Sequence, residues 1–162
     1  MLWLRGLLFT LLVPTMVGYL IPASLPHPPP GESLAAHGGW ILIAAGAAIY
    51  LNCLLRFLAA GGTPAIYFTR AFRHVIGEEP DALVSGGLYR FSRNPMYVAV
   101  VTAVFGQAVL YQSHAIAIYG FVVFVCFHIA VVWVEEPHLR AVRGTEYADY
   151  CRRVPRWIGL PR

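Results

Sequence analysis

Residues 86–97 read GGLYRFSRNPMY and separate two strongly apolar halves of the chain. Pro95 suits the first turn of a helix, where its missing N–H group is not needed, and Asn94 is a favourable N-cap residue. The free N–H groups at such a helix start, beside Arg93, predict a receptor for a carboxylate or a phosphate. The alternative is a basic turn next to a membrane that only fixes topology.

The composition indicates an integral membrane protein. Of the 162 residues, 58% are hydrophobic and only 12% are charged, whereas about a quarter are charged in soluble domains. The net charge of +4 comes with arginine as the sole strong base, because the sequence contains no lysine. These arginines lie beside apolar segments, which predicts orientation in the bilayer and contact with anionic lipids, and no binding of nucleic acid. The three cysteines and six histidines show no metal-ligand spacing, so no metal is predicted.

Four apolar runs predict an all-α membrane domain over residues 1–162. The expected spans cover residues 2–21, 40–60, 95–111 and 115–134; a bilayer-spanning helix needs about 20 residues, so the third is short. A polar connector (61–94) and an amphipathic C-terminal helix (135–153) complete the chain. A cleavable signal peptide is the alternative for the first run, which follows Arg5.

The arginines also predict the orientation of these spans. The loops after the first and third spans contain no arginine, whereas the connector contains four and the tail contains six. Because arginine-rich segments stay on the cytoplasmic side, the connector, the tail and both termini are expected there.

This topology brings Glu135 and Glu136 to the level of Arg93. Two adjacent carboxylates at a membrane boundary are costly unless they are solvated or paired, with Arg93, Arg90 or a cationic ligand as possible partners. Arginine and a helix start for an anion, carboxylates for a cation or ribose, and tyrosines for stacking together fit a zwitterionic adenosyl amino acid. No phosphate-binding glycine motif of a soluble nucleotide fold is present. His128 is interpreted as a hydrogen-bonded core residue and not as a catalytic base.

Two motifs carry a resemblance to a known superfamily. Residues 87–97 (GLYRFSRNPMY) resemble the Arg-His/Asn-Pro-x-Tyr signature of the isoprenylcysteine carboxyl methyltransferase and phospholipid N-methyltransferase superfamily. Residues 135–157, with Glu135-Glu136 and the later run RVPRW, are similar to its C-terminal signature. Asn94 stands where the eukaryotic isoprenylcysteine enzymes have His, and Arg143 stands where Phe is usual. Both departures concern the acceptor more than the cofactor.

The resemblance implies an enzyme that binds S-adenosylmethionine from the cytoplasmic side and methylates an amphiphilic acceptor. The acceptor group is a carboxylate, an amine or a thiol. The implied cofactor shell is Gly87, Tyr89, Arg93, Asn94, Pro95, Tyr97, Glu135 and Glu136. Arg153, Arg156 and Tyr147 are the candidates for acceptor binding and catalysis. The alternatives are a non-catalytic lipid-binding bundle and an NADPH-dependent reductase related to sterol reductases; Glu135-Glu136 favours methyl transfer over reduction.

Overall fold

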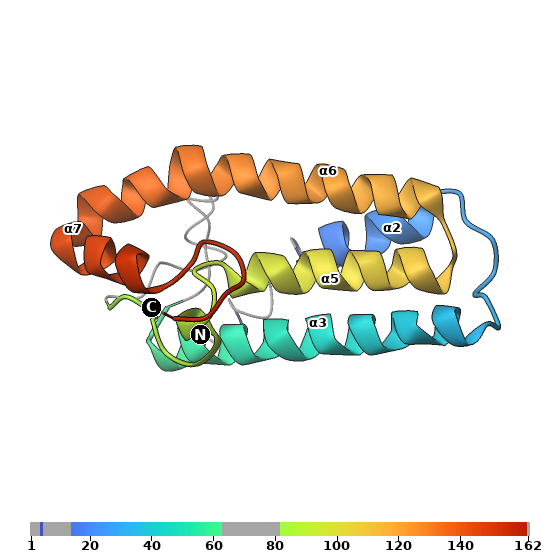
Figure 1. Ribbon diagram of the computed structural model, residues 1–162, viewed down its shortest axis with the longest axis horizontal. Helices are drawn as coiled ribbons and strands as arrows, with labels where there is room; N and C mark the ends of the chain where they lie inside the picture. Colours follow the sequence, from blue (N-terminus) through green and yellow to red (C-terminus); the bar gives the residue numbers. More distant parts are fainter. Residues whose placement is uncertain (1–3, 5–13, 63–81, 162) are drawn as a thin grey trace.

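The computed structural model describes residues 4, 14–62 and 82–161, and every regular element within them is helical. Three long helices lie along the long axis of the molecule: α3 (Leu34–Ala59), α5 (Pro95–Leu110) and α6 (His114–Ala130) (Figure 1). The middle helix, α5, packs against both α3 and α6. A π-helical turn, η4 (Val131–Glu135), leads α6 directly into α7 (Glu136–Arg153).

Shorter elements flank these helices. The π-helical η1 (Met16–Leu20) and the single-turn α2 (Ile21–Ser24) lie beside the bundle, and η1 packs against α5. A 3₁₀ turn, η3 (Gly87–Arg90), precedes α5. Two side chains fix η1 to the long helices: Gln107 Nε2 donates to Gly18 O at 2.5 Å, and the Tyr119 hydroxyl donates to Val17 O at 3.0 Å.

The helix starts follow local capping signals. Pro95 begins α5 as predicted. The helix expected over 40–60 begins earlier, at Leu34, because the Ser33 hydroxyl accepts a hydrogen bond from Ala36 N at 3.1 Å. Ser113 caps α6 in the same way, accepting from Ile116 N at 3.4 Å. The chain between α2 and α3 is therefore shorter than the predicted loop.

The described residues confirm an all-α chain but contain two stretches, not four, that are long and apolar enough to cross a membrane. These lie in Leu34–Ala59, where an 18-residue window has a mean hydropathy of 2.0, and in the helical run His114–Arg153, where such a window reaches 2.5. The helix α5 is also apolar, but its 16 residues are fewer than the 18 required of a candidate membrane span. Most of the span expected over 2–21 and much of the connector expected over 61–94 lie outside the described residues.

The two arginine-free loops meet at one end of the bundle. Gly31 N donates to Leu110 O at 2.8 Å, and Gln112 Nε2 donates to Ser33 Oγ at 3.2 Å. The rings of His27 and Tyr111 lie 4.2 Å apart. The segment before α5 and the whole of α7 lie at the opposite end (Figure 1). The loops that were expected on one side of the membrane thus share one end of the molecule.

The last helix is bent at Gly144. This residue has φ +51° and ψ −121°, in the left-handed half of conformational space that favours glycine. The second half of α7 therefore turns back toward the bundle, and the following segment passes the start of α5 (Figure 1). The sequence predicted one amphipathic helix over 135–153. Instead, the bend buries Tyr147 and Tyr150 against Val154 and leaves Val142 exposed.

Candidate functional site

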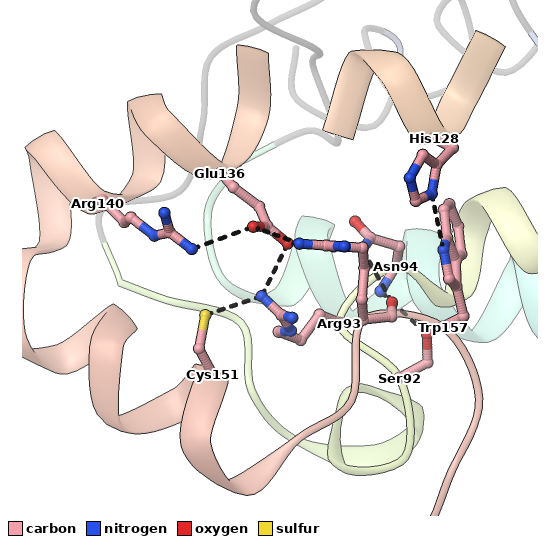
Figure 2. A network of polar contacts seen from close by, with 9 residues as sticks. Ser92, Arg93, Asn94, His128, Glu136, Arg140, Cys151 and Trp157 are labelled. Carbon is pink, nitrogen blue, oxygen red and sulfur yellow. Dashed lines mark hydrogen bonds and ion pairs between the residues drawn. The ribbon is translucent and has the colours of Figure 1, made fainter. Parts of the chain in front are cut away.

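The first residue of α7, Glu136, is almost fully buried and is bound by three arginines (Figure 2). Arg93 Nη1 lies 2.9 Å from Glu136 Oε1. Arg156 binds both carboxylate oxygens, with Nε 2.7 Å from Oε1 and Nη2 3.1 Å from Oε2. Arg140, one helical turn further along α7, reaches Oε2 at 3.3 Å. One carboxylate and three arginines together give the cluster a net positive charge.

These contacts set the charge state of Glu136. Burial alone would raise the pKa of its carboxyl group. The hydrogen bonds from Arg156 and the positive charges of Arg93, Arg156 and Arg140 outweigh burial, so the pKa lies below its usual value. Hydrogen bonding to Glu136 likewise raises the pKa of Arg156. Glu136 is therefore ionised at neutral pH, and its oxygens are occupied by arginine N–H groups.

Arg93 retains hydrogen-bonding capacity that the protein does not use. Its side chain is 11% exposed, and Nη1 also donates to the Cys151 sulfur at 2.9 Å. Its Nε atom is buried, and within the described part of the chain no acceptor lies within hydrogen-bond distance of that atom. An unsatisfied buried guanidinium N–H is costly. An anionic group bound at this position would satisfy it.

The neighbouring carboxylate, Glu135, faces a different part of the protein. Adjacent residues of a helix do not share a face, and Glu135 closes the π-helical turn η4 that precedes α7. The Tyr97 hydroxyl on α5 donates a hydrogen bond to Glu135 Oε1. The Tyr97 ring packs against Phe127 with their centroids 4.4 Å apart. The two glutamates that looked equivalent in sequence therefore have separate partners.

Asn94 and Ser92 hold the loop in front of α5. Asn94 lies at the N-cap position, but its side chain makes no capping hydrogen bond. Its Nδ2 donates instead to the backbone oxygen of Arg156 at 3.0 Å, while its backbone N–H donates to Ser92 Oγ at 3.0 Å. The predicted capping role of the Asn94 side chain is thus wrong. Its amide ties the α5 start to the segment after α7.

Gly87 and Tyr89 lie against α3. Gly87 has φ +61°, which favours glycine, and a Cβ atom there would lie 2.2 Å from Arg56 Cζ, so a larger residue would also displace this guanidinium. Arg56 is oriented by Asn52, whose Oδ1 accepts from Arg56 Nε at 3.2 Å. The ring of Tyr89 is buried edge-on against Phe57 at 5.8 Å. Both signature residues therefore support the loop from the α3 side.

Of the three candidates for acceptor binding and catalysis, Arg156 binds Glu136 directly, and Tyr147 lies within side-chain hydrogen-bonding reach of Arg93. The Arg156 side chain is 33% exposed. Tyr147 is buried, and its ring lies 6.1 Å from that of Tyr150. Burial raises the pKa of both tyrosines, so both stay protonated at neutral pH. Arg153 is exposed, and its Nε donates to Asp149 O at 3.4 Å on its own helix.

Sequence reasoning missed three members of this network: Arg140, Cys151 and Ser92. The spacing of Glu136 and Arg140, four residues apart on one helix, was a readable signal for an ion pair. Nothing local to Cys151 or Ser92 indicated their contacts. His128 accepts a hydrogen bond at Nδ1 from Trp157 Nε1 at 3.2 Å, which agrees with its interpretation as a hydrogen-bonded residue. Among the described residues, no three His, Cys, Asp or Glu side chains converge as metal ligands.

Comparison with known proteins shows which family the sequence matches, independently of the site geometry. The profile of a family described as phospholipid methyltransferase matches residues 38–146. Phosphatidylethanolamine N-methyltransferase B of Dictyostelium discoideum is 37% identical over 89 residues, which cover 52% of this chain and 40% of that protein. The cobalt-zinc-cadmium resistance protein CzcN of Cupriavidus metallidurans is 29% identical over 82 residues, covering 51% of this chain and 38% of that protein. The matches thus span about two fifths of the length of these relatives. No solved structure matches significantly.

Proposed function

The chain belongs to the phospholipid methyltransferase family, and we propose that it transfers a methyl group from S-adenosylmethionine to a lipid-like acceptor at a membrane surface. The observation that carries the proposal is the arginine cluster around Glu136. Its carboxylate and Arg93 are largely buried, the cluster is positively charged overall, and one N–H group of Arg93 has no partner among the described residues. Such a site favours an anionic group.

We assign the carboxylate of the cofactor to Arg93. Its guanidinium already has a fixed orientation, because Glu136 and Cys151 both accept from Nη1. Its unsatisfied Nε is one donor for the bound carboxylate, and the start of α5 adds a favourable helix dipole. When bound, S-adenosylmethionine supplies an electrophilic methyl group on a sulfonium.

The two glutamates then have different roles. Glu136 is saturated by arginines, so it organises the anion site and does not receive the cofactor's ammonium group. Because Glu136 is taken up by the arginines, we assign the other carboxylate of the pair, Glu135, to the ammonium group or the ribose hydroxyls. Its Oε1 accepts a hydrogen bond from the Tyr97 hydroxyl on α5. This assignment refines the expectation from sequence, which treated the pair alike.

The acceptor is a membrane lipid or a molecule that resembles one. An apolar groove of about 320 Å³ lies between η1, α3 and α5, and its lining includes Tyr50, Ala99 and Val100. Val100 follows Tyr97 on α5 by about one helical turn. The groove therefore offers a hydrocarbon chain a place beside the polar site, while the exposed part of Arg156 faces the headgroup.

For orientation in the membrane, we retain four spans with both termini in the cytoplasm. The meeting of the arginine-free loops at one end of the bundle supports this arrangement. The positively charged end, with Arg93, Arg140 and Arg156, then faces the cytoplasm, where S-adenosylmethionine is available.

The test is methyl transfer by purified protein in lipid vesicles. Labelled S-adenosylmethionine is supplied with vesicles of phosphatidylethanolamine, the lipid in the name of the Dictyostelium relative, and with total lipid extract. We expect label in a lipid product and its loss in Glu135→Gln. Cofactor binding without transfer into any lipid would favour a non-catalytic bundle, and binding of NADPH in place of S-adenosylmethionine would favour a reductase. Either result overturns the proposal.

A further inference from the structure

Hydrogen bonds join the segment after α7 to the loop before α5 at several points. Arg93 N donates to Pro155 O at 3.0 Å, and Gly159 N donates to Phe91 O at 3.1 Å. Between these two backbone contacts, the side-chain amide of Asn94 donates to Arg156 O at 3.0 Å. Residues 154–159, which we call the strap, thus lie across the loop before α5 and are held there through their backbone.

One contact ties the strap to a third element, α6. Trp157 Nε1 donates to His128 Nδ1 at 3.2 Å, and the two rings are stacked with centroids 5.9 Å apart and planes 28° apart. Phe124, one turn earlier on α6, lies 5.0 Å from the Trp157 ring. Figure 2 shows the His128 ring facing the Trp157 indole. An indole N–H only donates, so Nδ1 of His128 carries the lone pair.

The position of this contact in the chain connects it with the Glu136 cluster. Arg156 immediately precedes Trp157, and its guanidinium binds Glu136 in a bidentate manner. The backbone oxygen of Arg156 is fixed by Asn94 and the next side chain by His128. These anchors on either side of the residue determine where the Arg156 guanidinium points.

We propose that Trp157 and His128 are positioning residues that hold Arg156 in place for the acceptor. This inference rests on the methyl transfer proposed above and assigns Arg156 to the acceptor headgroup. Arg93 meets the strap only through its backbone, by the bond from its N–H to Pro155 O described above, whereas its side chain is held by Glu136 and Cys151, both on α7. The Trp157–His128 contact therefore controls acceptor affinity and leaves cofactor affinity unchanged.

The substitutions isolate the hydrogen bond from the ring packing. Trp157→Phe keeps an aromatic ring beside Phe124 but removes the N–H donor. His128→Phe keeps a ring but removes the acceptor, whereas His128→Asn restores an acceptor near the same position. The matched control is Trp133→Phe, because Trp133 is 76% exposed on η4.

The experiment measures two properties of the full chain in phosphatidylethanolamine vesicles. Loss of one hydrogen bond costs about 1 kcal/mol, so Trp157→Phe should raise the acceptor KM roughly fivefold, with cofactor affinity within about twofold of wild type. Hydrogen exchange at Gly159 should accelerate by about the same factor, since its amide donates to Phe91 O while the strap is docked. His128→Phe should behave alike, the double variant should be no worse, and His128→Asn should recover part of the loss.

The outcomes separate this inference from the proposed function. Unchanged exchange and unchanged acceptor KM in Trp157→Phe would overturn the positioning role. Equal losses of cofactor and acceptor affinity would also overturn it, because they would indicate general loosening. If wild-type protein transfers no methyl group, the proposed function fails and the assignment of Arg156 to an acceptor fails with it. The exchange data would then still report whether His128 and Trp157 hold the strap.

Discussion

The two ends of the bundle are held together in opposite ways. Toward the arginine-free loops, α3 and α5 approach so closely that glycine is required at the contact. A Cβ atom at Gly39 would lie 2.5 Å from Gly106 O, and one at Gly106 would lie 2.8 Å from Gly39 O. Small residues that let helix backbones touch are typical of packing in membranes. This end is fixed by shape.

At the other end, segments distant in sequence are joined by charge. Glu136 receives arginines from the loop before α5, from α7 and from the strap. Ion pairs tolerate small displacements that a backbone contact does not, and a guanidinium can exchange one anionic partner for another. Backbone contact therefore fixes the helices at one end, whereas ion pairs join separate segments at the other.

The largest expected effect comes from removing the central charge. Glu136→Gln leaves Arg93, Arg140 and Arg156 facing one another without their carboxylate. Removing one partner of a buried ion pair costs about 3 kcal/mol. We expect Glu136→Gln to lower the unfolding free energy by about this amount, measured by titrating sodium dodecyl sulfate into mixed micelles.

The control is Glu146→Gln on the same helix, where the side chain is exposed. Its effect should stay within about 0.5 kcal/mol. If both variants lose equal stability, the charged end is not organised around Glu136, and the contrast between the two ends is wrong.

The next effect tests the end that is fixed by shape. Gly39→Ala puts a methyl group against Gly106 O and should destabilise the protein by about 2 kcal/mol in the same titration, because the clash is with backbone. Gly38→Ala is the matched control, since nothing lies within 4 Å of a Cβ atom there. It should be neutral or stabilise by up to about 1 kcal/mol, as alanine favours a helix over glycine. Effects of equal sign would contradict close packing as the organising contact.

A third pair of variants compares Arg93 with Arg90, the two arginines of the loop before α5. Arg93→Lys should weaken binding of S-adenosylmethionine about tenfold, because the compact lysine ammonium lacks the planar fork whose separate Nη1 and Nε donors serve Glu136 and the cofactor carboxylate. Arg90→Lys should be almost silent, since Arg90 is exposed at the end of η3. Calorimetry on both folded variants decides between them. Equal effects would make these arginines anchors for topology and remove Arg93 from the cofactor site.

The smallest expected effect concerns a neutral hydrogen bond at the charged end. The Tyr150 hydroxyl donates to Tyr89 O at 2.7 Å, in a buried contact between α7 and η3. Tyr150→Phe should lower the unfolding free energy by about 1 kcal/mol. Tyr19→Phe, at a side chain that is 60% exposed, should change it by less than about 0.5 kcal/mol. A loss in Tyr150→Phe as large as that in Glu136→Gln would show that ion pairing does not dominate this end.

Sequence predicts the helices better than it predicts the contacts between them. The start of α5 follows from Pro95, whose effect is local. The helix α3 begins before the apolar run at 40–60, at Leu34, because Ser33 is an ordinary capping residue. Such boundaries depend on neighbouring residues, so sequence carries the information.

The network around Glu136 was predictable only in part. A pairing between a glutamate of the tail and Arg93 was among the alternatives, because the hairpin of spans brings both to one level. Arg156 reaches Glu136 because α7 bends at Gly144. The apolar pattern of residues 135–153 did not indicate this bend. The separate environments of Glu135 and Glu136 depend in the same way on the π-helical turn η4, which sequence did not indicate.

The strap also has a consequence for the order of folding. Asn94 and Arg156, which it joins, are separated by 62 residues, and Arg93 and Cys151 by 58. The helices α3, α5 and α6 all precede the strap in the chain, so during synthesis they can associate before residues 154–159 reach the loop before α5. The cluster around Glu136, which needs Arg156, then assembles last, and a nascent chain that stops before the strap would carry the helices without that cluster.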